Sequence, residues 1–424
     1  MINTTMTELR RLNADDMPQL SRLHSVVYNN RRVFTEGEPR DPLSLPPEWS
    51  WGFFENGKLQ SGMMEINYLM NFDGNSVPMS GIAGVGTLPE SRKGGLVRAI
   101  FEKLLPEAYE RGVIFSCLAP FSYSYYRQFG YEISCARNRI SIPLKDFSHQ
   151  KLRGNFTQVF PGDDTTDLAE VHSEYIKKVN HGIHRDHWPE NLAWRQFTNN
   201  DPYAKGIFLY QWKDESGKNG GHVKYEVRKE PNKTIASISE LVFRDMESLY
   251  GILSIFGVQN AQIDGFEWLM PSFIDPMDLT QGISKNDMEI EQRIILRDMT
   301  RVINVKAALE MMRMETMWMD KTVTGSTSTP NLEGDFCIGV EDSLIHANNA
   351  NFLVEFGKQG KRVSITKKEP DIKCDIPALS QLITGYRSLD SMLFSKQKGL
   401  EVYGNRNVLS GIFRQRPQHL TEYF

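Results

Sequence analysis

The chain has 424 residues, of which 40% are apolar and 24% are charged, and its formal net charge at neutral pH is −4. This length and composition are ordinary for a globular protein of two or three domains. The slight negative charge argues against a nucleic-acid-binding protein, which usually has a basic surface, and is compatible with a cationic substrate.

The cysteines and the N-terminal sequence indicate in which cellular compartment we expect the protein. The four cysteines are Cys117, Cys135, Cys337 and Cys374. They form no CxxC pair, so we expect neither a disulfide framework nor a zinc site, and a reduced, cytoplasmic location. The N-terminal stretch has no apolar core like that of a signal peptide, and no apolar run in the sequence is long enough to cross a bilayer.

Residues 7–145 alternate between strand and helix patterns. A short strand, "ELRRL", precedes a helical pattern in "NADDMPQLSRLHSVVYNN". Asn56-Gly57 then lies between two strand-like runs, and Asp73-Gly74 marks a second hairpin turn before the strand "GIAGVGT". The expected order is strand, helix, several antiparallel strands, helix, strand, helix and strand.

The stretch "PESRKGGLVRAIFEKLL" follows this strand and predicts a basic glycine turn and then a helix. Leu96, Ile100, Leu104 and Ala108 recur on one helical face, and Gly112 is placed to end the helix. Unpaired N–H groups at the start of a helix can bind a phosphate or pyrophosphate. Neither a Walker loop nor GxGxxG is present, so from these residues alone an anion site and an ordinary turn fit equally well.

After the strand "VIFSCLA", the helix "YSYYRQFG" and the strand "YEISCARNRISI", a polar stretch at 145–156 reads as a linker. The next residues repeat the order of the first unit up to the strand "DGFEWLMP", with a helix beginning at Met246. The turn before that helix has no basic glycine element. We interpret this as an internal duplication whose second copy has lost the loop.

A third unit begins at about Leu296. "MTRVINVKAALEMM" predicts a helix with Val302, Val305 and Leu309 on one face. The strands "DFCIGVEDSL", "NFLVEFG", "RVSITKK" and "KCDIP" follow, with helices in "ALSQLITGYRSL" and "NVLSGIFRQRP". This order predicts an α+β domain.

Two of these motifs carry a resemblance to a known family. The strand, the glycine turn with its helix, and "FSYSYYRQFGYE" resemble the GNAT acetyltransferases, whose pattern Arg/Gln-x-x-Gly-x-Gly/Ala binds the pyrophosphate of acetyl-CoA. Arg92 and Gly95 match this pattern, whereas Val97 stands where the family has Gly or Ala.

The resemblance is closer to the enhanced intracellular survival (Eis) family of GNAT proteins, and it extends over the whole chain. The Pro-x-x-Arg-x-x-Gly-Leu pattern is matched by Pro89, Arg92, Gly95 and Leu96, and the Tyr-x-x-Phe-Gly-Tyr pattern by Tyr126, Phe129, Gly130 and Tyr131. The resemblance implies a mixed α+β and α/β chain: a catalytic GNAT domain over 1–145, a degenerate GNAT-like domain over 146–295, and a sterol-carrier-protein-like domain over 296–424.

The same resemblance implies the site residues. The expected cofactor-binding residues, for acetyl-CoA as co-substrate and without a metal, are Val85, Gly86, Thr87, Arg92, Lys93, Gly94, Gly95, Leu96, Val97, Arg98, Phe121 and Ser122. Tyr126 resembles the family's general acid, since a phenol can protonate a thiolate leaving group. From the residues alone, the aromatic cluster around Tyr126 indicates core packing instead, and Tyr125 stands beside it.

The chain ends at Phe424, and Eis-like proteins end in Phe with a terminal carboxylate that acts as general base. A frayed tail is the other interpretation, since chain ends are often poorly ordered. Glu36 and Glu38 are candidates for holding a polycationic acceptor, or they belong to a solvated loop. The family's acceptors are amines, including aminoglycosides and lysine side chains, and the family assembles as a hexamer.

Two further interpretations stay open. The histidines of "HGIHRDHW", which are His181, His184 and His187, have a spacing that metal ligands can adopt, but a polar surface segment explains them as well. The leading function is an acetyl-CoA-dependent N-acetyltransferase. The competing function is a carrier of an apolar ligand with a catalytically weak first domain.

Overall fold

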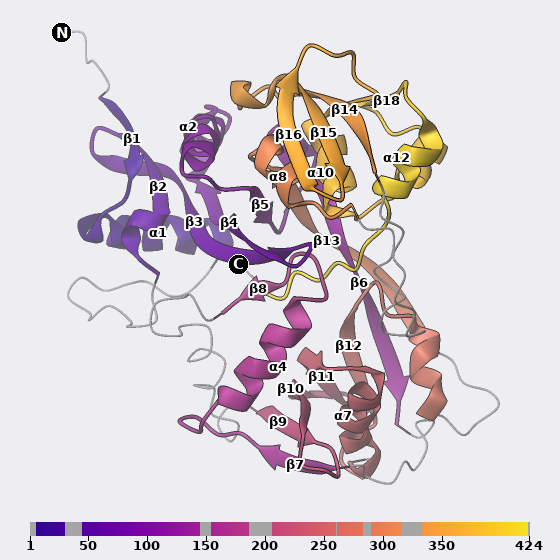
Figure 1. Ribbon diagram of the computed structural model, residues 1–424. Helices are drawn as coiled ribbons and strands as arrows, with labels where there is room; N and C mark the ends of the chain where they lie inside the picture. The colour runs from indigo at the N-terminus through magenta and orange to yellow at the C-terminus, as the bar shows by residue number, and fades with distance from the viewer. Residues whose placement is uncertain are drawn as a thin grey trace. The chain divides into compact units, whose positions relative to one another are not determined.

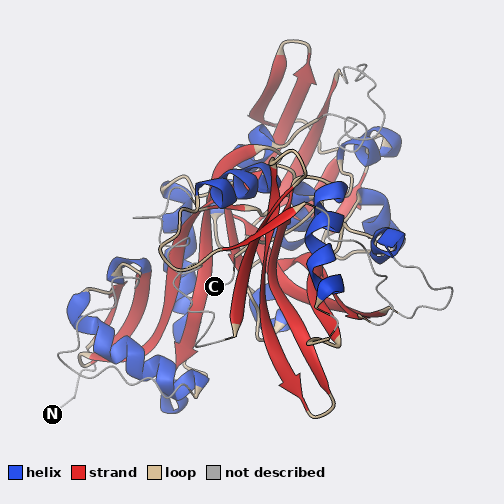
Figure 2. Ribbon diagram, turned by 90° about the horizontal axis from the view of Figure 1, so that it is seen from below, coloured by secondary structure: helices blue, strands red, loops and turns tan. Residues whose placement is uncertain are grey.

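The computed structural model describes residues 6–29, 45–144, 154–185, 206–259, 261–282, 290–314 and 333–422. The chain divides into two compact units (Figure 1). The first unit contains the described residues up to Ser134, those within Asp298–Arg416, and Glu422. The second unit contains Cys135–Arg297 and the tail segment Pro417–Thr421. Figure 2 shows that both are built from sheets with helices packed against them.

The first unit opens with a mainly antiparallel sheet. Its strands, in spatial order, are β1 (Thr7–Arg11), β2 (Ser50–Glu55), β3 (Lys58–Phe72), β4 (Asn75–Thr87), β5 (Phe115–Leu118) and the end of β13 (Glu291–Val302). Asn56 and Gly57 join β2 to β3, with φ of 49° and 75°. Asp73 and Gly74 join β3 to β4, with φ of 50° and 82°. Both predicted hairpins are therefore confirmed.

Helices α1 (Met17–Tyr28) and α2 (Leu96–Glu110) cover opposite faces of this sheet. Trp51 of β2 packs in one apolar cluster with Ile100 of α2, whereas Phe54 packs in another with Leu20 of α1. Residues an odd number of positions apart on a strand point to opposite faces, which explains the two clusters. The helix α3 (Tyr123–Arg127) follows β5.

Strands β4 and β5 run parallel and then part. Their pairing extends from Met79 opposite Phe115 to Ile82 opposite Leu118, where β5 ends. β4 continues for five residues to Thr87, and along this stretch it carries a bulge, since Met64 pairs with Ala83 but Gly62 pairs with Gly86. The end of β4 therefore has an open edge on the side of β5 among the described residues.

The first unit also contains a second sheet, of order β16-β15-β14-β17-β18. These strands are β14 (Gly334–Glu341), β15 (Ala350–Gly357), β16 (Gly360–Thr366), β17 (Ile372–Asp375) and β18 (Leu400–Val402). The accompanying helices are α8 (Val305–Met311), α10 (Ile376–Thr384), α11 (Leu389–Phe394) and α12 (Arg406–Ile412). This is the α+β domain that the sequence predicts for the third part of the chain.

The second unit repeats the strand and helix order of the first. Its elements are β6 (Glu132–Pro143), β7 (Asn155–Gln158), α4 (Thr166–Ile176), β8 (Ile183–His184), β9 (Ile207–Lys213), β10 (Asn219–Glu230), β11 (Lys233–Phe243), α7 (Met246–Val258) and β12 (Gly265–Pro271). β9, β10 and β11 are antiparallel, α7 follows, and β12 pairs with β11 in parallel. The same order in β2, β3, β4, α2 and β5 confirms the predicted duplication.

One predicted helix differs from the structure at its start, whereas a predicted strand is confirmed and has a partner distant in sequence. The predicted helix at 299–312 is wrong at its start, because Met299–Val302 pairs with β5 as a strand and the helix begins only at Val305. The strand over 131–142 exists as β6, but from Arg137 onward it pairs with β12. Strand partners far apart in sequence leave no local signal. The predicted boundaries of the three domains stay a prediction.

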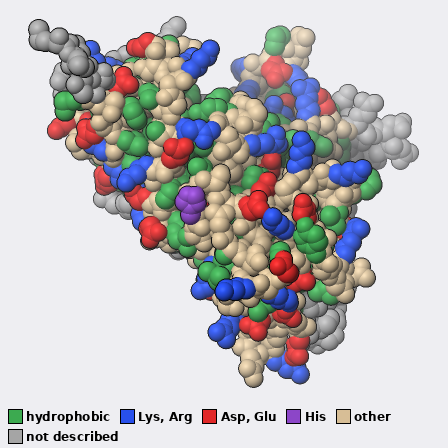
Figure 3. All heavy atoms as spheres, turned by 90° about the horizontal axis from the view of Figure 1, so that it is seen from above, with side chains coloured by type: hydrophobic (Ala, Val, Ile, Leu, Met, Phe, Trp, Pro, Cys, Tyr) green, Lys and Arg blue, Asp and Glu red, His purple; other side chains and the backbone are tan. Residues whose placement is uncertain are grey.

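Two surface properties complete the description. On the face drawn in Figure 3, Lys and Arg side chains are interspersed with Asp and Glu side chains. Within the described ranges, no helix combines the length and the apolar character that a membrane crossing requires.

Candidate active site

A pocket of about 770 Å³ lies in the first unit, where β4 and β5 part. Its lining residues come from α1, the end of β4, the glycine turn, α2 and the segment around α3. They are Val27, Tyr28, Val85, Gly86, Thr87, Ser91, Arg92, Lys93, Gly95, Leu96, Val97, Arg98, Phe121, Tyr125, Gln128 and Phe129. Ten of the twelve predicted cofactor-binding residues are in this set; Gly94 and Ser122 are not.

The start of α2 forms one side of the pocket. Gly95 is the N-cap residue with φ of 76°, and no described side chain caps the helix there. A Cβ at Gly95 would meet nothing within 4 Å, so the left-handed backbone, and not crowding, favours glycine. Lys93 also has a positive φ, of 67°. The first-turn N–H groups therefore face an open pocket, as an anion site requires.

The basic residues of the turn have different surroundings. Arg92 is exposed and its Nε lies 3.4 Å from the carbonyl oxygen of Thr87. Arg98 hydrogen-bonds to Gln128, and its guanidinium lies 5.3 Å from the centre of the Phe129 ring. Arg98 therefore joins α2 to the segment after α3 at the pocket wall. Val97, which departs from the common GNAT pattern, is 8% exposed and packs in the core, where its larger side chain is accommodated.

The open edge of β4 forms the opposite side of the pocket, and α1 holds its bulge in place. The Tyr28 hydroxyl donates to the Val85 carbonyl at 2.9 Å, and His24 Nε2 lies 3.0 Å from the Gly84 carbonyl oxygen. Gly84 has φ of 58°, and a Cβ there would lie 2.8 Å from His24 Nε2. Sequence reasoning named neither His24 nor Tyr28, although their i, i+4 spacing places both on one face of α1.

The segment around α3 closes the far wall. Phe121 is 73% exposed and lines the pocket, together with the half-buried Tyr125. The ring centres of Phe121 and Tyr125 lie 5.2 Å apart. Ser122 instead caps α3, since its hydroxyl oxygen accepts from the Tyr125 N–H at 3.4 Å. Ser122 therefore shapes the wall by fixing the start of the helix.

Tyr126 lies behind this wall. Its side chain is 2% exposed, and its ring centre lies 5.3 Å from that of Tyr125 and 5.4 Å from that of Phe121. Burial raises the pKa of Tyr126, and the nearby Tyr28 hydroxyl raises it further. The phenol is therefore neutral at neutral pH and can donate a hydrogen bond, and Tyr126 is not among the described residues that line the pocket.

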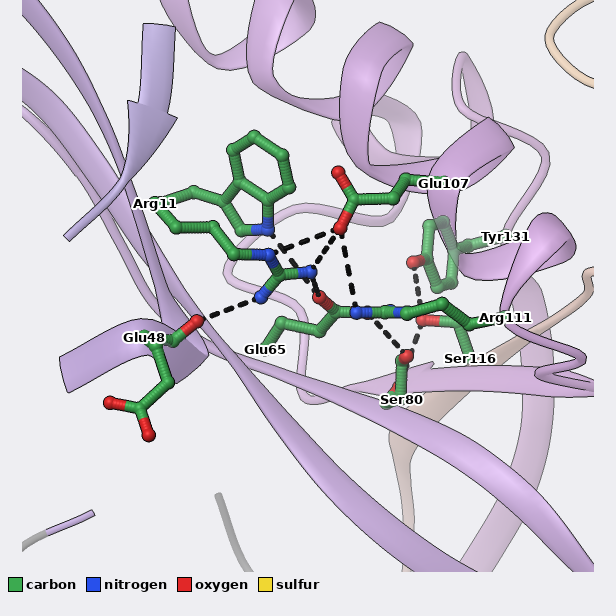
Figure 4. A network of polar contacts seen from close by, with 9 residues as sticks. Arg11, Glu48, Glu65, Ser80, Glu107, Arg111, Ser116 and Tyr131 are labelled. Atoms are coloured by element: carbon green, nitrogen blue, oxygen red, sulfur yellow. Dashed lines mark hydrogen bonds and ion pairs between the residues drawn. The ribbon is translucent and has the colours of Figure 1, made fainter. Parts of the chain in front are cut away.

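A buried carboxylate joins β3 to the C-terminal end of α2 (Figure 4). The Glu65 side chain of β3 is fully buried and accepts from Ser80 Oγ at 2.7 Å and from Arg11 Nη2 at 2.8 Å. Arg111 at the end of α2 also donates to it. Burial alone would raise the pKa of Glu65, but the bonds from Arg111 and Ser80 outweigh this effect and lower it.

The network of Figure 4 continues toward the tyrosines. Ser116 Oγ donates to the Ser80 carbonyl at 2.9 Å and lies 2.7 Å from the Tyr131 hydroxyl oxygen. The ring of Tyr131 is fully buried and lies 6.3 Å from that of Tyr126, centre to centre. The hydrogen bond from Ser116 of β5, whose hydroxyl also bonds to β4, therefore holds Tyr131, the residue against which Tyr126 packs.

Several predicted residues lie outside the described residues. These are Glu36, Glu38, His187 and Phe424. Of the histidine group, His181 is buried in the second unit, with Nδ1 2.6 Å from Gln418 Oε1. No group of His, Cys, Asp and Glu in the described part of the chain is arranged to hold a metal ion.

Two parts of the chain match known families. The family of GNAT acetyltransferase domains matches residues 8–134, and the sterol carrier protein domain family matches residues 305–420. No curated protein matches the chain in sequence.

Three solved structures resemble the chain over 99% of its length and 100% of theirs. A probable N-acyltransferase from Enterococcus faecalis has 22% identity and a TM-score of 0.80. A GCN5-related N-acetyltransferase from Anabaena variabilis has 20% identity and a TM-score of 0.80. Eis1 from Mycobacterium abscessus has 18% identity and a TM-score of 0.76. At these identities the structures establish a shared fold, and the family match supplies the activity class. The chain therefore contains a GNAT acetyltransferase domain at 8–134 and a sterol carrier protein domain at 305–420, and it shares a whole-chain fold with Eis1, as its motifs predict.

Proposed function

We propose that the protein is an acetyl-CoA-dependent N-acetyltransferase that acylates amines of a polycationic acceptor, either an aminoglycoside-like molecule or a lysine side chain. The observation that carries this proposal is the pocket between the uncapped start of α2 and the open edge of β4. Its helix N-terminus suits a pyrophosphate. Its strand edge offers backbone groups to the amides of a pantetheine arm.

The bound co-substrate supplies an acetyl group activated as a thioester, and the protein supplies proximity and proton transfer. The acceptor nitrogen attacks the carbonyl carbon, the new C–N bond forms and the C–S bond breaks. Tyr126 donates a proton to the departing sulfur, and the terminal carboxylate of Phe424 accepts the proton that the amine loses. The products are an amide and free CoA.

The tail segment Pro417–Thr421, which precedes Phe424, is held by several hydrogen bonds within the second unit, and this supports the proposed role of the chain end. The Asn180 N–H donates a hydrogen bond to the Pro417 carbonyl at 2.9 Å, and the Asn180 carbonyl accepts one from the His419 N–H at 2.9 Å. The Tyr175 hydroxyl oxygen lies 2.7 Å from His419 Nδ1, and Thr421 Oγ1 accepts from the Ile183 N–H at 3.0 Å.

This role of the tail leads to a prediction. Extending the chain by a few residues beyond Phe424 should lower kcat at least about tenfold, the usual scale for losing a general base. The affinity for acetyl-CoA should stay within about twofold, which equilibrium binding would measure. Unchanged kcat would remove the terminal carboxylate from the mechanism.

The acceptor, the compartment and the assembly belong to the same proposal. We place Glu36 and Glu38 beside the acceptor, because a carboxylate pair would attract a polycation. We propose a reduced cytoplasmic setting, which the four buried free cysteines support, and assembly as a hexamer, which mass measurement in solution would test.

The experiment is release of CoA measured with a panel of polyamines and aminoglycosides, on the wild type and on Tyr126→Phe. We expect turnover with at least one amine, and a fall in kcat of about 100-fold in Tyr126→Phe. Tyr125→Phe is the matched control, since it removes the neighbouring hydroxyl and should retain most of the activity. Equal losses in both variants would remove Tyr126 from its role as the acid.

The second candidate function is a carrier of an apolar ligand, which the sterol carrier protein domain at 305–420 favours. Absence of turnover with every amine, together with tight binding of a lipid, would support the carrier and contradict the acetyltransferase.

A further inference from the structure

A buried ion pair joins the sterol carrier protein domain to the turn that follows Tyr126. Arg301, on β13, is 1% exposed, and its Nη2 lies 2.7 and 2.8 Å from the two carboxylate oxygens of Asp342. Asp342 directly follows β14 and lies in the matched sterol carrier protein domain. The second terminal nitrogen of this guanidinium, Nη1, donates to the carbonyl oxygen of Phe129 at 2.8 Å.

Phe129 connects this pair to both parts of the proposed site. Its N–H donates to the Tyr126 carbonyl at 3.0 Å, so the two residues belong to one tight turn. Its ring stacks on Phe101 of α2, with centres 4.4 Å apart, and lines the pocket. A guanidinium that fixes the Phe129 carbonyl therefore fixes the direction in which the chain leaves Tyr126.

Gly130 shows how closely the guanidinium approaches this turn. It has φ of 83°, which favours glycine, and a Cβ there would overlap the Arg301 guanidinium. The same Cβ would lie 3.1 Å from Ile376 Cγ2, at the start of α10. The glycine of the Phe-Gly-Tyr motif is thus the residue type that lets Arg301 and α10 pack directly on the turn.

The loop of the sterol carrier protein domain holds Asp342 firmly. Its carboxylate also accepts from the N–H groups of Leu344 and Ile345, at 2.9 and 3.1 Å, and from Asn348 Nδ2 at 2.9 Å. Burial opposes ionisation, but the Arg301 charge and these bonds keep the pKa of Asp342 below its usual value. The carboxylate is therefore charged at neutral pH. Because its own loop holds it in place, it fixes the orientation of the Arg301 guanidinium.

We propose that Arg301 and Asp342 are positioning residues for Tyr126, so that the sterol carrier protein domain is a working part of the acyl-transfer site. The inference rests on the proposed role of Tyr126 as general acid. It assigns to this domain a function that needs no lipid ligand.

The test is a double-mutant cycle on the full-length chain. Asp342→Asn keeps the shape of the side chain but removes its charge, so we expect kcat to fall about tenfold, with KM for acetyl-CoA within about threefold. In the Tyr126→Phe background the same substitution should change kcat less than twofold, because residues that act through one another are not additive. An equal loss in both backgrounds would overturn the proposal.

A matched control separates positioning from general destabilisation. Glu240→Gln breaks another buried ion pair, in which Arg185 Nη2 lies 2.6 Å from the carboxylate, and both residues belong to the second unit. We expect its kcat to stay within about twofold of the wild type; a fall equal to that of Asp342→Asn would overturn the proposal. If Asp342→Asn fails to fold, Arg301→Lys carries the same cycle, because one ammonium cannot bridge both partners.

The outcomes distinguish this inference from the proposed function. A wild type without turnover, or an unimpaired Tyr126→Phe, contradicts the proposed function. An active wild type with an impaired Tyr126→Phe, and with Asp342→Asn no worse than Glu240→Gln, contradicts the positioning role alone.

Discussion

The helices α2 and α7 occupy equivalent places in the two duplicated folds, but their N-termini differ. α2 starts at a glycine with an open first turn that faces the pocket. α7 starts at Asp245, whose carboxylate accepts from the Ser248 N–H at 2.8 Å. A carboxylate at this place uses the first-turn donors and repels a phosphate. The N-cap residue thus leaves the first-turn N–H groups of α2 without a side-chain cap, whereas in α7 the Asp245 side chain caps them.

The surroundings of α7 complete the difference. Arg244, just before the helix, is paired with Glu170 and Glu174 of α4, so its charge is already neutralised. The Trp212 ring packs against Gly220 and against Gly251 within α7, where a Cβ would overlap it. In the second unit, the space beside the start of α7 is therefore filled by packed side chains. The comparison teaches that both folds place a helix N-terminus at the same position. The loop and the N-cap residue determine whether that N-terminus is open.

The largest effect should follow from giving α2 the cap of α7. Gly95→Asp places a carboxylate beside the proposed pyrophosphate, and two like charges about 4 Å apart repel by about 4 kcal/mol at an effective dielectric constant of 20. We therefore expect kcat/KM for acetyl-CoA to fall about 100-fold or more. Gly95→Asn is the matched control, because Asn tolerates the same backbone without the charge. Equal behaviour of the two variants would contradict an anion site.

A smaller effect should follow from removing the buried carboxylate that joins β3 to the C-terminal end of α2. Glu65→Gln removes the buried one of the two carboxylates that pair with Arg11 and Arg111 and leaves only Glu107, so we expect the free energy of unfolding to fall by about 1–3 kcal/mol. Glu240 of the second unit has Arg185 and His222 as partners, and its pKa is likewise lowered, mainly by Arg185 against the effect of burial.

The pH dependence of stability sharpens this prediction. Because the pKa of Glu65 is lowered by folding, its contribution is present above its usual value of 4.5 and is lost as the pH falls through the lower folded value. Thermal unfolding curves of the wild type and Glu65→Gln should therefore differ at pH 7 and converge in acid. A difference that is constant with pH would show that the carboxylate charge does not matter.

The smallest effect should follow from removing the cap of α7. Asp245→Ala loses the bond to Ser248, and a lost N-cap costs about 1 kcal/mol of stability. We expect a lower thermal midpoint and an unchanged kcat/KM for acetyl-CoA. A change in kcat/KM would mean that the second unit takes part in binding the co-substrate.

Local sequence predicted the parts of the site that depend on local chemistry. Gly95 and the start of α2 were predicted from the glycine turn, and Asn56-Gly57 predicted its hairpin. The residues that sequence missed act across long separations. Tyr28 reaches Val85, and Arg301 reaches both Phe129 and Asp342. An isolated Tyr or Arg in a sequence carries no signal of such a partner, because the sheet topology decides which residues meet.

The strand β13 is a second feature that local sequence could not predict. The residues at 299–302 follow the periodicity of the next helix, yet they pair with β5 because an edge of the first sheet is available to them. Tertiary pairing here overrides the local pattern.

The most direct test of the account is calorimetric titration of CoA into the full-length chain, with and without Gly95→Asp. The account places one CoA site per chain, at α2, so it predicts a stoichiometry of one per chain and loss of measurable binding in Gly95→Asp, while Asp245→Ala binds as the wild type does. Two sites per chain, or binding that survives Gly95→Asp unchanged, would contradict it.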